Sequence, residues 1–316
     1  MSPVKRIILS AILAIVFCQL AFVFIKREID KYQIHNTGRM QELLYNKTNY
    51  DVLFIGSSRT HLTINPAIID SICHVNSYNA GIEGGNLFEF NMMLKAYLQN
   101  HPAPKWLVLT LDLHSFVADY KFFNYAQYFS YTKNKIIKDY LDHNGYNTLR
   151  LRVFPFLELT DYDDNMKGYF VKGLMGYSEI PEGDFQYKGY LSNTQNQVDT
   201  AAPVSAPVNV EIANSRKGCL VEIMNTCNTN HIKIIFTYAP EYKHKIAEGI
   251  SNNKEVFDVM NDFAAEKNIP FFRHDSLNIC NNPGLFANPG HLNRNGADIY
   301  SSILAEHLNK IIKREH

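Results

Sequence analysis

The most constraining feature of this sequence is a short apolar run, Val52–Ile55, that ends abruptly in Gly56-Ser57-Ser58. Consecutive apolar residues bounded by polar ones are typical of a strand buried on both faces, as in a parallel sheet. The glycine and the serines then follow the carboxyl end of that strand, the edge where open α/β sheets bind ligands. A serine there can act as a nucleophile, or both serines can simply cap the next helix.

A second polar segment, Asn288-Pro289-Gly290-His291, lies near the other end of the chain. An amphipathic helix is predicted directly after it, because Ile299, Ile303, Leu304 and Leu308 recur at helical spacing. A histidine in this place can serve as a base for a serine nucleophile, provided that the fold brings the two together.

These two segments resemble the first and last motifs of the SGNH (GDSL-like) hydrolase superfamily. The closest likeness is to its membrane-anchored branch of envelope acyl-transfer proteins, the DltD-like and alginate-acetylation proteins. The family's Gly-Asp-Ser motif places the nucleophile at Ser58 and leaves Ser57 where an aspartate usually stands. Its Asp-x-x-His motif matches the segment that ends at His291. The resemblance covers about residues 50–116 and 230–312.

The second motif of the family contributes an oxyanion-hole glycine, which Tyr78-Asn79-Ala80-Gly81 resembles. The third motif normally supplies an asparagine, but the corresponding region, Leu109–His114, has none. The last motif has Asn288 in place of its aspartate. In the well-known Ser-His-Asp proteases that exchange costs about 10⁴ in turnover, whereas papain-like sites function with asparagine. Asp112 and Asp275 are alternative sources of the missing acid.

The resemblance implies a role for each candidate residue. Ser58 is the nucleophile, His291 the base and Asn288 the residue that orients the imidazole, while the N–H groups of Ser58 and Gly81 form the oxyanion hole. Arg59 follows the nucleophile and is predicted to bind an anionic group of the substrate, with a structural salt bridge as the alternative. No cofactor is implied, and no Cys-x-x-Cys spacing indicates a metal site.

A charge-free run from Ile7 to Ile25 is long enough to cross a bilayer as a helix. No small-residue cleavage site follows it, so residues 1–27 are predicted to be an uncleaved signal anchor and 28–49 a stalk. The flanking positive charges do not indicate an orientation. The resemblance implies a single-pass protein of the inner (cytoplasmic) membrane with its main domain outside the cytoplasm.

Residues 50–316 are predicted to form the SGNH-like domain. Three strands separated by short helices occupy its first part, and further strand and helix patterns resume after about residue 230. The resemblance implies a three-layer α/β fold with a five-stranded parallel sheet in flavodoxin-like order. Residues 115–215 interrupt the pattern as a large insertion, rich in aromatic residues and ending in an extended loop, Ser192–Pro207. It is predicted to form a lid or lobe, with aromatic side chains that stack on sugars or pack in a core.

Composition narrows the function further. The net charge is zero and the sequence pI is about 7.2, so the chain has no basic excess of the kind that nucleic-acid binding requires. Of the five cysteines, only Cys219 and Cys227 are close enough in sequence to favour a bridge.

Taken together, the sequence predicts a membrane-anchored serine esterase or O-acyltransferase. It would act on a cell-envelope saccharide through a Ser58 acyl-enzyme, with O-acetyl as the expected group. The alternative is a catalytically weakened or inactive relative that binds a glycan or a membrane-bound O-acyltransferase.

Overall fold

The computed structural model of this chain describes residues 2–31, 37–118, 122, 124–162, 164–176, 186–196, 198 and 206–315. The chain forms two compact units. Unit 1 consists of residues 1–42 and 124–181, and unit 2 of residues 43–123 and 182–316. The first part of the predicted insertion therefore groups with the N-terminal helix, and the rest groups with the sheet.

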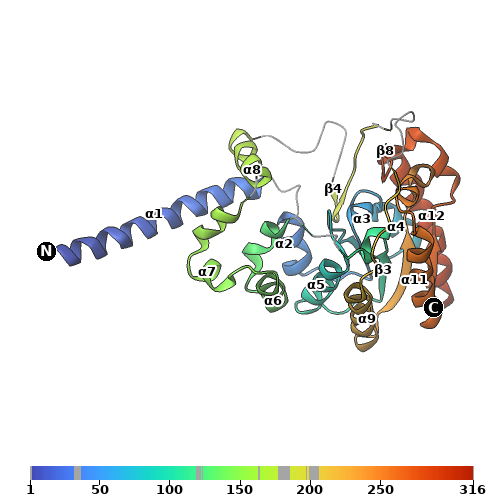
Figure 1. The fold of residues 1–316 in the computed structure, drawn as a ribbon, viewed down its shortest axis with the longest axis horizontal. Coiled ribbons are helices and arrows are strands. Elements are labelled where there is room, and N and C mark those ends of the chain that lie inside the picture. The colour runs from blue at the N-terminus through green and yellow to red at the C-terminus, as the bar shows by residue number, and fades with distance from the viewer. Residues whose placement is uncertain are drawn as a thin grey trace. The chain divides into compact units, whose positions relative to one another are not determined.

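The centre of unit 2 is a five-stranded parallel sheet with the order β2-β1-β3-β6-β7 (Figure 1). This is the flavodoxin-like order that the resemblance implied, so the predicted fold class is confirmed. The strands are β1 (Val52–Ile55), β2 (Ser77–Asn79), β3 (Trp106–Thr110), β6 (Lys233–Tyr238) and β7 (Phe271–Arg273).

Helices pack on both faces of this sheet because the central strands are apolar on both sides. Val52 and Phe54 of β1 share one core cluster with Ile69 of α4 and Leu304 of α12. On the other face, α5 packs against α9, and α9 contacts β6. The helices of unit 2 are α3 (Ser58–His61), α4 (Pro66–Cys73), α5 (Leu87–Leu98), α9 (Asn214–Thr229), α10 (Lys245–Glu248), α11 (Asn253–Glu266) and α12 (Arg294–Ile312).

Two small hairpins accompany the main sheet, and the sequence did not predict either. They are β4 (Gln186–Tyr187) with β5 (Tyr190–Leu191), and β8 (Phe286–Asn288) with β9 (His291–Leu292). The second hairpin contains the whole Asn288–His291 segment, and α12 begins two residues after it. The pairing of this hairpin is irregular between Phe286 and Asn288. Asn288 pairs directly with His291, so the two residues are neighbours across a short turn.

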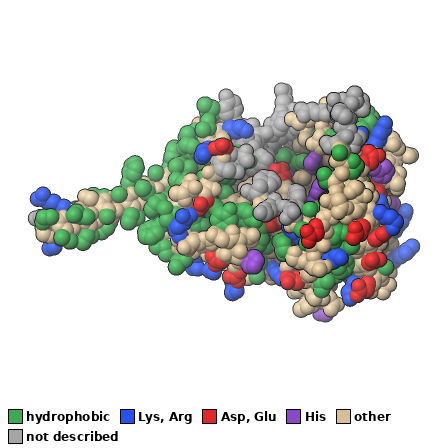
Figure 2. Space-filling view, viewed as in Figure 1, with side chains coloured by type: hydrophobic (Ala, Val, Ile, Leu, Met, Phe, Trp, Pro, Cys, Tyr) green, Lys and Arg blue, Asp and Glu red, His purple; other side chains and the backbone are tan. Residues whose placement is uncertain are grey.

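Unit 1 is helical. Its α1 (Pro3–Lys31) is long and apolar enough to span a membrane. Apolar side chains in the N-terminal part of this helix are exposed: Ile7 is 70% and Phe17 72% exposed. Hydrophobic side chains cover this helix along its length (Figure 2). The insertion adds 3₁₀ helices and three α-helices: η2 (Tyr125–Tyr131), α6 (Lys135–His143), α7 (Thr148–Val153), η3 (Pro155–Asp161) and α8 (Asp164–Met175). A further helix, α2 (Thr37–Tyr45), lies at the unit boundary.

The structure bears on three further expectations from the sequence. Tyr128 and Phe129 are buried, so these rings pack in a core and are not sugar-stacking surfaces. Cys219 and Cys227 lie on one helix, α9, where eight positions correspond to about 12 Å of rise, so they cannot form a bridge. The predicted loop Ser192–Pro207 falls partly outside the described residues, and the lid remains a prediction.

Leu304 on α12 gives a test of this packing. Its side chain is fully buried in the cluster that joins α12 to β1, so Leu304→Ala is expected to lower the free energy of unfolding by about 2–5 kcal/mol. Ile299→Ala on the same helix is the matched control, because that side chain is 43% exposed. Equilibrium urea unfolding of the full-length variants measures both, and equal losses would contradict the packing described.

Candidate active site

The two serines after β1 have different environments. Ser57 is the N-cap of α3, and its Oγ accepts a hydrogen bond of 3.1 Å from the Arg59 N–H. Ser58 is the first residue of the helix, with its side chain directed elsewhere. The capping interpretation therefore holds for Ser57 and not for Ser58.

Ser58 lies within hydrogen-bond distance of the histidine that the sequence singled out. Its Oγ is 2.8 Å from His291 Nε2, across 233 positions of sequence. His291 Nδ1 is in turn 2.9 Å from Asn288 Oδ1. The Gly290 N–H also donates to that same Asn288 atom, at 3.0 Å, which identifies the atom as the amide oxygen. Nδ1 therefore donates, and Nε2 is left to accept the Ser58 proton.

The surroundings of His291 favour its neutral form. Burial lowers the pKa of His291 below its ordinary value, and the positive charge of Arg59 lowers it further. Asp112 and Glu83 act in the opposite direction but do not reverse the shift in pKa. A neutral imidazole at pH 7 is the form that can take a proton from a serine hydroxyl.

The two predicted oxyanion donors differ in their hydrogen bonds. The Ser58 N–H makes no hydrogen bond to any residue that the structure describes, as expected at the first position of a helix. The Gly81 N–H donates to Asn79 Oδ1 at 3.0 Å and so already has an acceptor, and the oxyanion role of Gly81 stays a prediction. A side chain at Gly81 would collide with the backbone of His61, so this glycine allows the strand exit to pack closely on α3.

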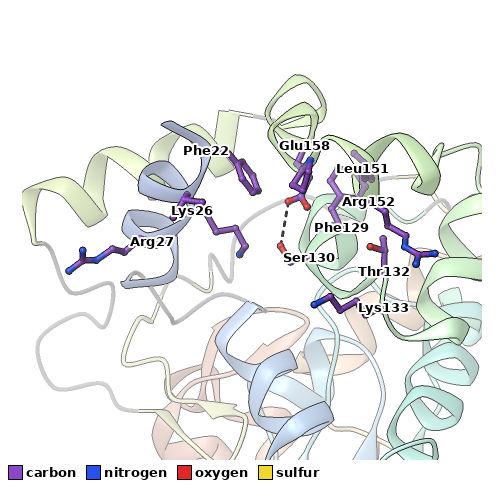
Figure 3. Close-up of a pocket in the computed structure, with 12 residues that line it drawn as sticks. Phe22, Lys26, Arg27, Phe129, Ser130, Thr132, Lys133, Leu151, Arg152 and Glu158 are labelled. Atoms are coloured by element: carbon purple, nitrogen blue, oxygen red, sulfur yellow. Dashed lines mark hydrogen bonds between the residues drawn. The ribbon is translucent and has the colours of Figure 1, made fainter. Parts of the chain in front are cut away.

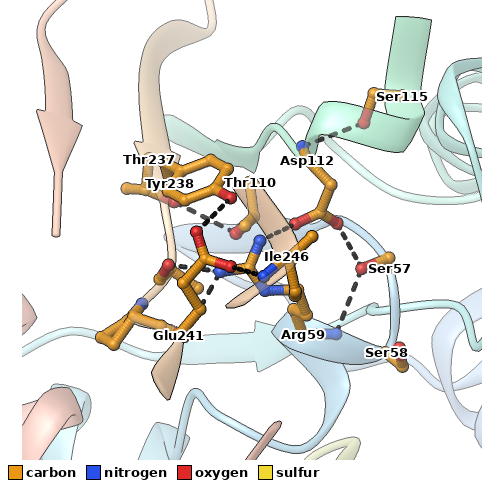
Figure 4. A network of polar contacts seen from close by, with 12 residues as sticks. Ser57, Ser58, Arg59, Thr110, Asp112, Ser115, Thr237, Tyr238, Glu241 and Ile246 are labelled. Carbon is orange, nitrogen blue, oxygen red and sulfur yellow. Dashed lines mark hydrogen bonds and ion pairs between the residues drawn. The ribbon is translucent and has the colours of Figure 1, made fainter. Parts of the chain in front are cut away.

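Arg59 does not face a substrate. Only 5% of it is exposed, and its Nη1 donates to Asp112 Oδ1 at 2.7 Å. Its Nη2 donates to the carbonyl oxygens of Ala239 and Pro240, and the guanidinium lies over the Tyr238 ring (Figure 4). The predicted substrate-binding role of Arg59 is therefore corrected to the alternative, a structural ion pair.

The same network continues to the exit of β6. Tyr238 Oη donates to Glu241 Oε1 at 3.0 Å, and Glu241 Oε2 accepts from the N–H groups of Ile246 and Ala247 at the start of α10. Burial alone would lower the pKa of Arg59, but Tyr238, Asp112 and Glu241 raise that pKa, so the guanidinium keeps its charge.

The positions at which the chain departs from the SGNH pattern contact each other. Ser57 stands where the family has aspartate, and Asp112 lies in the region that lacks the usual asparagine; the Ser57 hydroxyl donates to Asp112 Oδ2. Sequence reasoning missed this role of Asp112, although the two departures, considered together, were a usable signal.

Neither alternative acid reaches His291. Asp112 is bonded to Ser57 and Arg59, and Asp275 to Arg273, with His244 Nδ1 4.0 Å away. The third member of the site is therefore Asn288, and it is exposed to solvent. Within the described residues, no group of three or more His, Cys, Asp or Glu side chains could hold a metal ion.

No protein-family model matches this chain, and no curated protein matches it either. A solved structure from Bacteroides fragilis, of a protein with an inferred acylhydrolase activity, aligns at 13% identity and a TM-score of 0.45, covering 87% of this chain and 96% of that one. An inferred lipolytic protein of the G-D-S-L family from Desulfitobacterium hafniense aligns at 12% identity and a TM-score of 0.42, covering 81% and 97%.

Asp112→Ala is expected to lower the free energy of unfolding by about 3–5 kcal/mol, because it leaves Arg59 buried without its carboxylate partner. The double variant Arg59→Met/Asp112→Ala removes both charges and should recover part of that loss. Urea unfolding of the two variants beside the wild type checks this. A double variant less stable than Asp112→Ala would contradict the ion-pair account.

Proposed function

We propose that this protein is a serine esterase or O-acyltransferase that works through an acyl-enzyme on Ser58. The observation that carries the proposal is the continuous relay from Ser58 Oγ through His291 to Asn288 Oδ1, at 2.8 and 2.9 Å. A nucleophile bonded to a base, with the base oriented by a third group, is the arrangement that covalent acyl transfer requires.

The chemistry divides between these groups as follows. Ser58 Oγ attacks the acyl carbon of an ester while its proton passes to His291 Nε2. The Ser58 N–H stabilises the negative charge that develops on the acyl oxygen. His291 then returns the proton to the departing alkoxide. In the second half, water or an acceptor hydroxyl gives its proton to His291 and attacks the acyl-serine, which yields the free acid or a new ester and restores Ser58.

The proposed setting is the cell envelope. The resemblance to envelope acyl-transfer proteins and the membrane-length α1 support a single-pass protein of the cytoplasmic membrane, with the site outside the cytoplasm and a saccharide as substrate. O-acetyl is the proposed acyl group. A membrane-bound O-acyltransferase is the proposed partner that would supply or receive it.

A second candidate function is favoured by Asn288. An amide oxygen orients the imidazole but does not neutralise the imidazolium formed during attack, and solvent reaches this residue. The protein would then hold a glycan or a partner acyltransferase at the same edge of the sheet and turn over slowly or not at all.

Labelling of the full-length protein with a fluorophosphonate, read by intact mass, tests the proposal. One adduct per chain is expected in the wild type, none in Ser58→Ala, and a labelling rate lower by about 10²–10⁴ in His291→Ala, because proton removal is lost.

Ser57→Ala is the matched control, since it removes the adjacent hydroxyl and should still label. Its own effect is expected on stability, with a loss of about 1 kcal/mol from the missing cap. A wild-type protein that is folded yet unlabelled by several such probes would exclude the acyl-enzyme.

Asn288→Asp tests the role of the amide. A carboxylate beside His291 stabilises the imidazolium, so the labelling rate should rise at least tenfold. In the wild type, labelling should fall as the pH drops through a pKa below 6.5, since His291 is then protonated and cannot accept the serine proton. Asn288→Asp should shift that fall to higher pH. An unchanged rate and an unchanged pH profile would show that Asn288 does not limit the chemistry.

A further inference from the structure

One pocket in unit 1 lies between α1 and the insertion, and no residue of the candidate active site lines it. Its volume is about 810 Å³. One wall is the C-terminal part of α1, with Phe22 and Lys26, and the opposite wall comes from η2, α7 and the residues beside them, with Phe129, Lys133 and Arg152 (Figure 3).

The polarity of the pocket changes along α1 over a single turn. Phe22 and Val23 belong to the charge-free run Ile7–Ile25, which spans roughly 28 Å at 1.5 Å per residue, close to the hydrocarbon thickness of a bilayer. Lys26 and Arg27 follow at once. If α1 spans the membrane, this wall crosses from the level of the acyl chains to the level of the lipid phosphates.

The opposite wall of the pocket also combines apolar and positively charged residues. Pro155 is partly exposed there beside the buried Phe129 and Leu151, and Lys133 and Arg152 provide positive charge. Glu158 is the one acid among the residues that line the pocket, against the four cations of the two walls. The pocket thus has an excess of positive charge beside apolar surface, which fits an amphiphile with an anionic head.

The insertion packs closely against α1. Gly173 on α8 lies so close to the carbonyl of Glu28 that any side chain there would collide with it, and the rings of Phe24 and Phe170 meet edge to face at 6.3 Å. Large apolar side chains on either side of Arg152 in sequence, Leu149 and Val153, are 68% and 57% exposed. Such side chains suit a segment that touches the membrane surface.

We propose that this pocket binds an anionic glycerophospholipid, with the phosphate between the cations of the two walls and the upper acyl chains against Val23 and Pro155, the apolar lining residues with exposed area. The inference rests on α1 lying in the membrane and is independent of the chemistry at Ser58. It gives the insertion a role in holding a membrane lipid beside the anchor.

The test uses the full-length protein in a neutral detergent, titrated with phosphatidylglycerol or phosphatidylcholine of identical chains. Native mass spectrometry counts the lipids that remain bound. The wild type should retain phosphatidylglycerol several-fold more than phosphatidylcholine. Lys133→Gln/Arg152→Gln should reduce that retention at least tenfold, because two charges near the phosphate are removed.

The matched control is Lys135→Gln/Lys138→Gln. It removes the same charge from α6 of the same unit but outside the pocket, and its retention should equal that of the wild type. Thermal melts verify that both variants fold, and fluorophosphonate labelling of Ser58 should be the same in both, which separates this proposal from the proposed function.

Two outcomes would overturn the proposal. Equal retention of the two lipids, or equal loss in both double variants, would mean that only general charge and the bare helix attract lipid. Displacement of the bound lipid by millimolar glycerol 3-phosphate would mean that the pocket recognises a free phosphate and not a membrane lipid.

Discussion

The buried charge of Arg59 is the interaction on which the carboxyl edge of the sheet depends. A guanidinium removed from water costs several kcal/mol unless it is paired and hydrogen-bonded. Here the partners come from two other strand exits: Asp112 after β3, and the carbonyls of Ala239 and Pro240 after β6. One side chain therefore fixes the ends of three neighbouring strands. Ser58 is the residue immediately before it, so the position of the nucleophile follows from the same contacts.

The histidine reaches this edge by a different route. It is carried on the β8–β9 hairpin, which hydrogen-bonds to the rest of the fold through the contact from the Tyr242 N–H to the Pro289 carbonyl. Asn288 orients the ring through its amide oxygen and adds no charge beside the imidazole. Asn288 thus holds the imidazole in position, but it does not supply a negative charge that would stabilise the protonated imidazole.

Local patterns predicted the buried strands and the polar residues that follow them, whereas the order of the sheet and the Ser58–His291–Asn288 grouping came from the family resemblance. The sequence did not indicate which acceptor the Gly81 N–H would bind or that Arg59 would be buried, because both depend on how side chains are placed in the folded chain. Asn79 Oδ1 and Asp112 decide those two outcomes. The insertion was also poorly predicted: α7 and α8 are short or only weakly amphipathic, and their stability comes from packing inside unit 1 and not from their own periodicity.

The separation of 233 positions between Ser58 and His291 has a consequence for how the protein is made. A chain synthesised from its N-terminus contains Ser58 long before it contains His291. During that interval Ser58 has no partner to take its proton, and the strand exits around Arg59 are still incomplete, because β6 has not been added. The acyl transfer proposed for Ser58 therefore requires β6 and the β8–β9 hairpin, and a nascent chain that lacks them would have no base for that reaction.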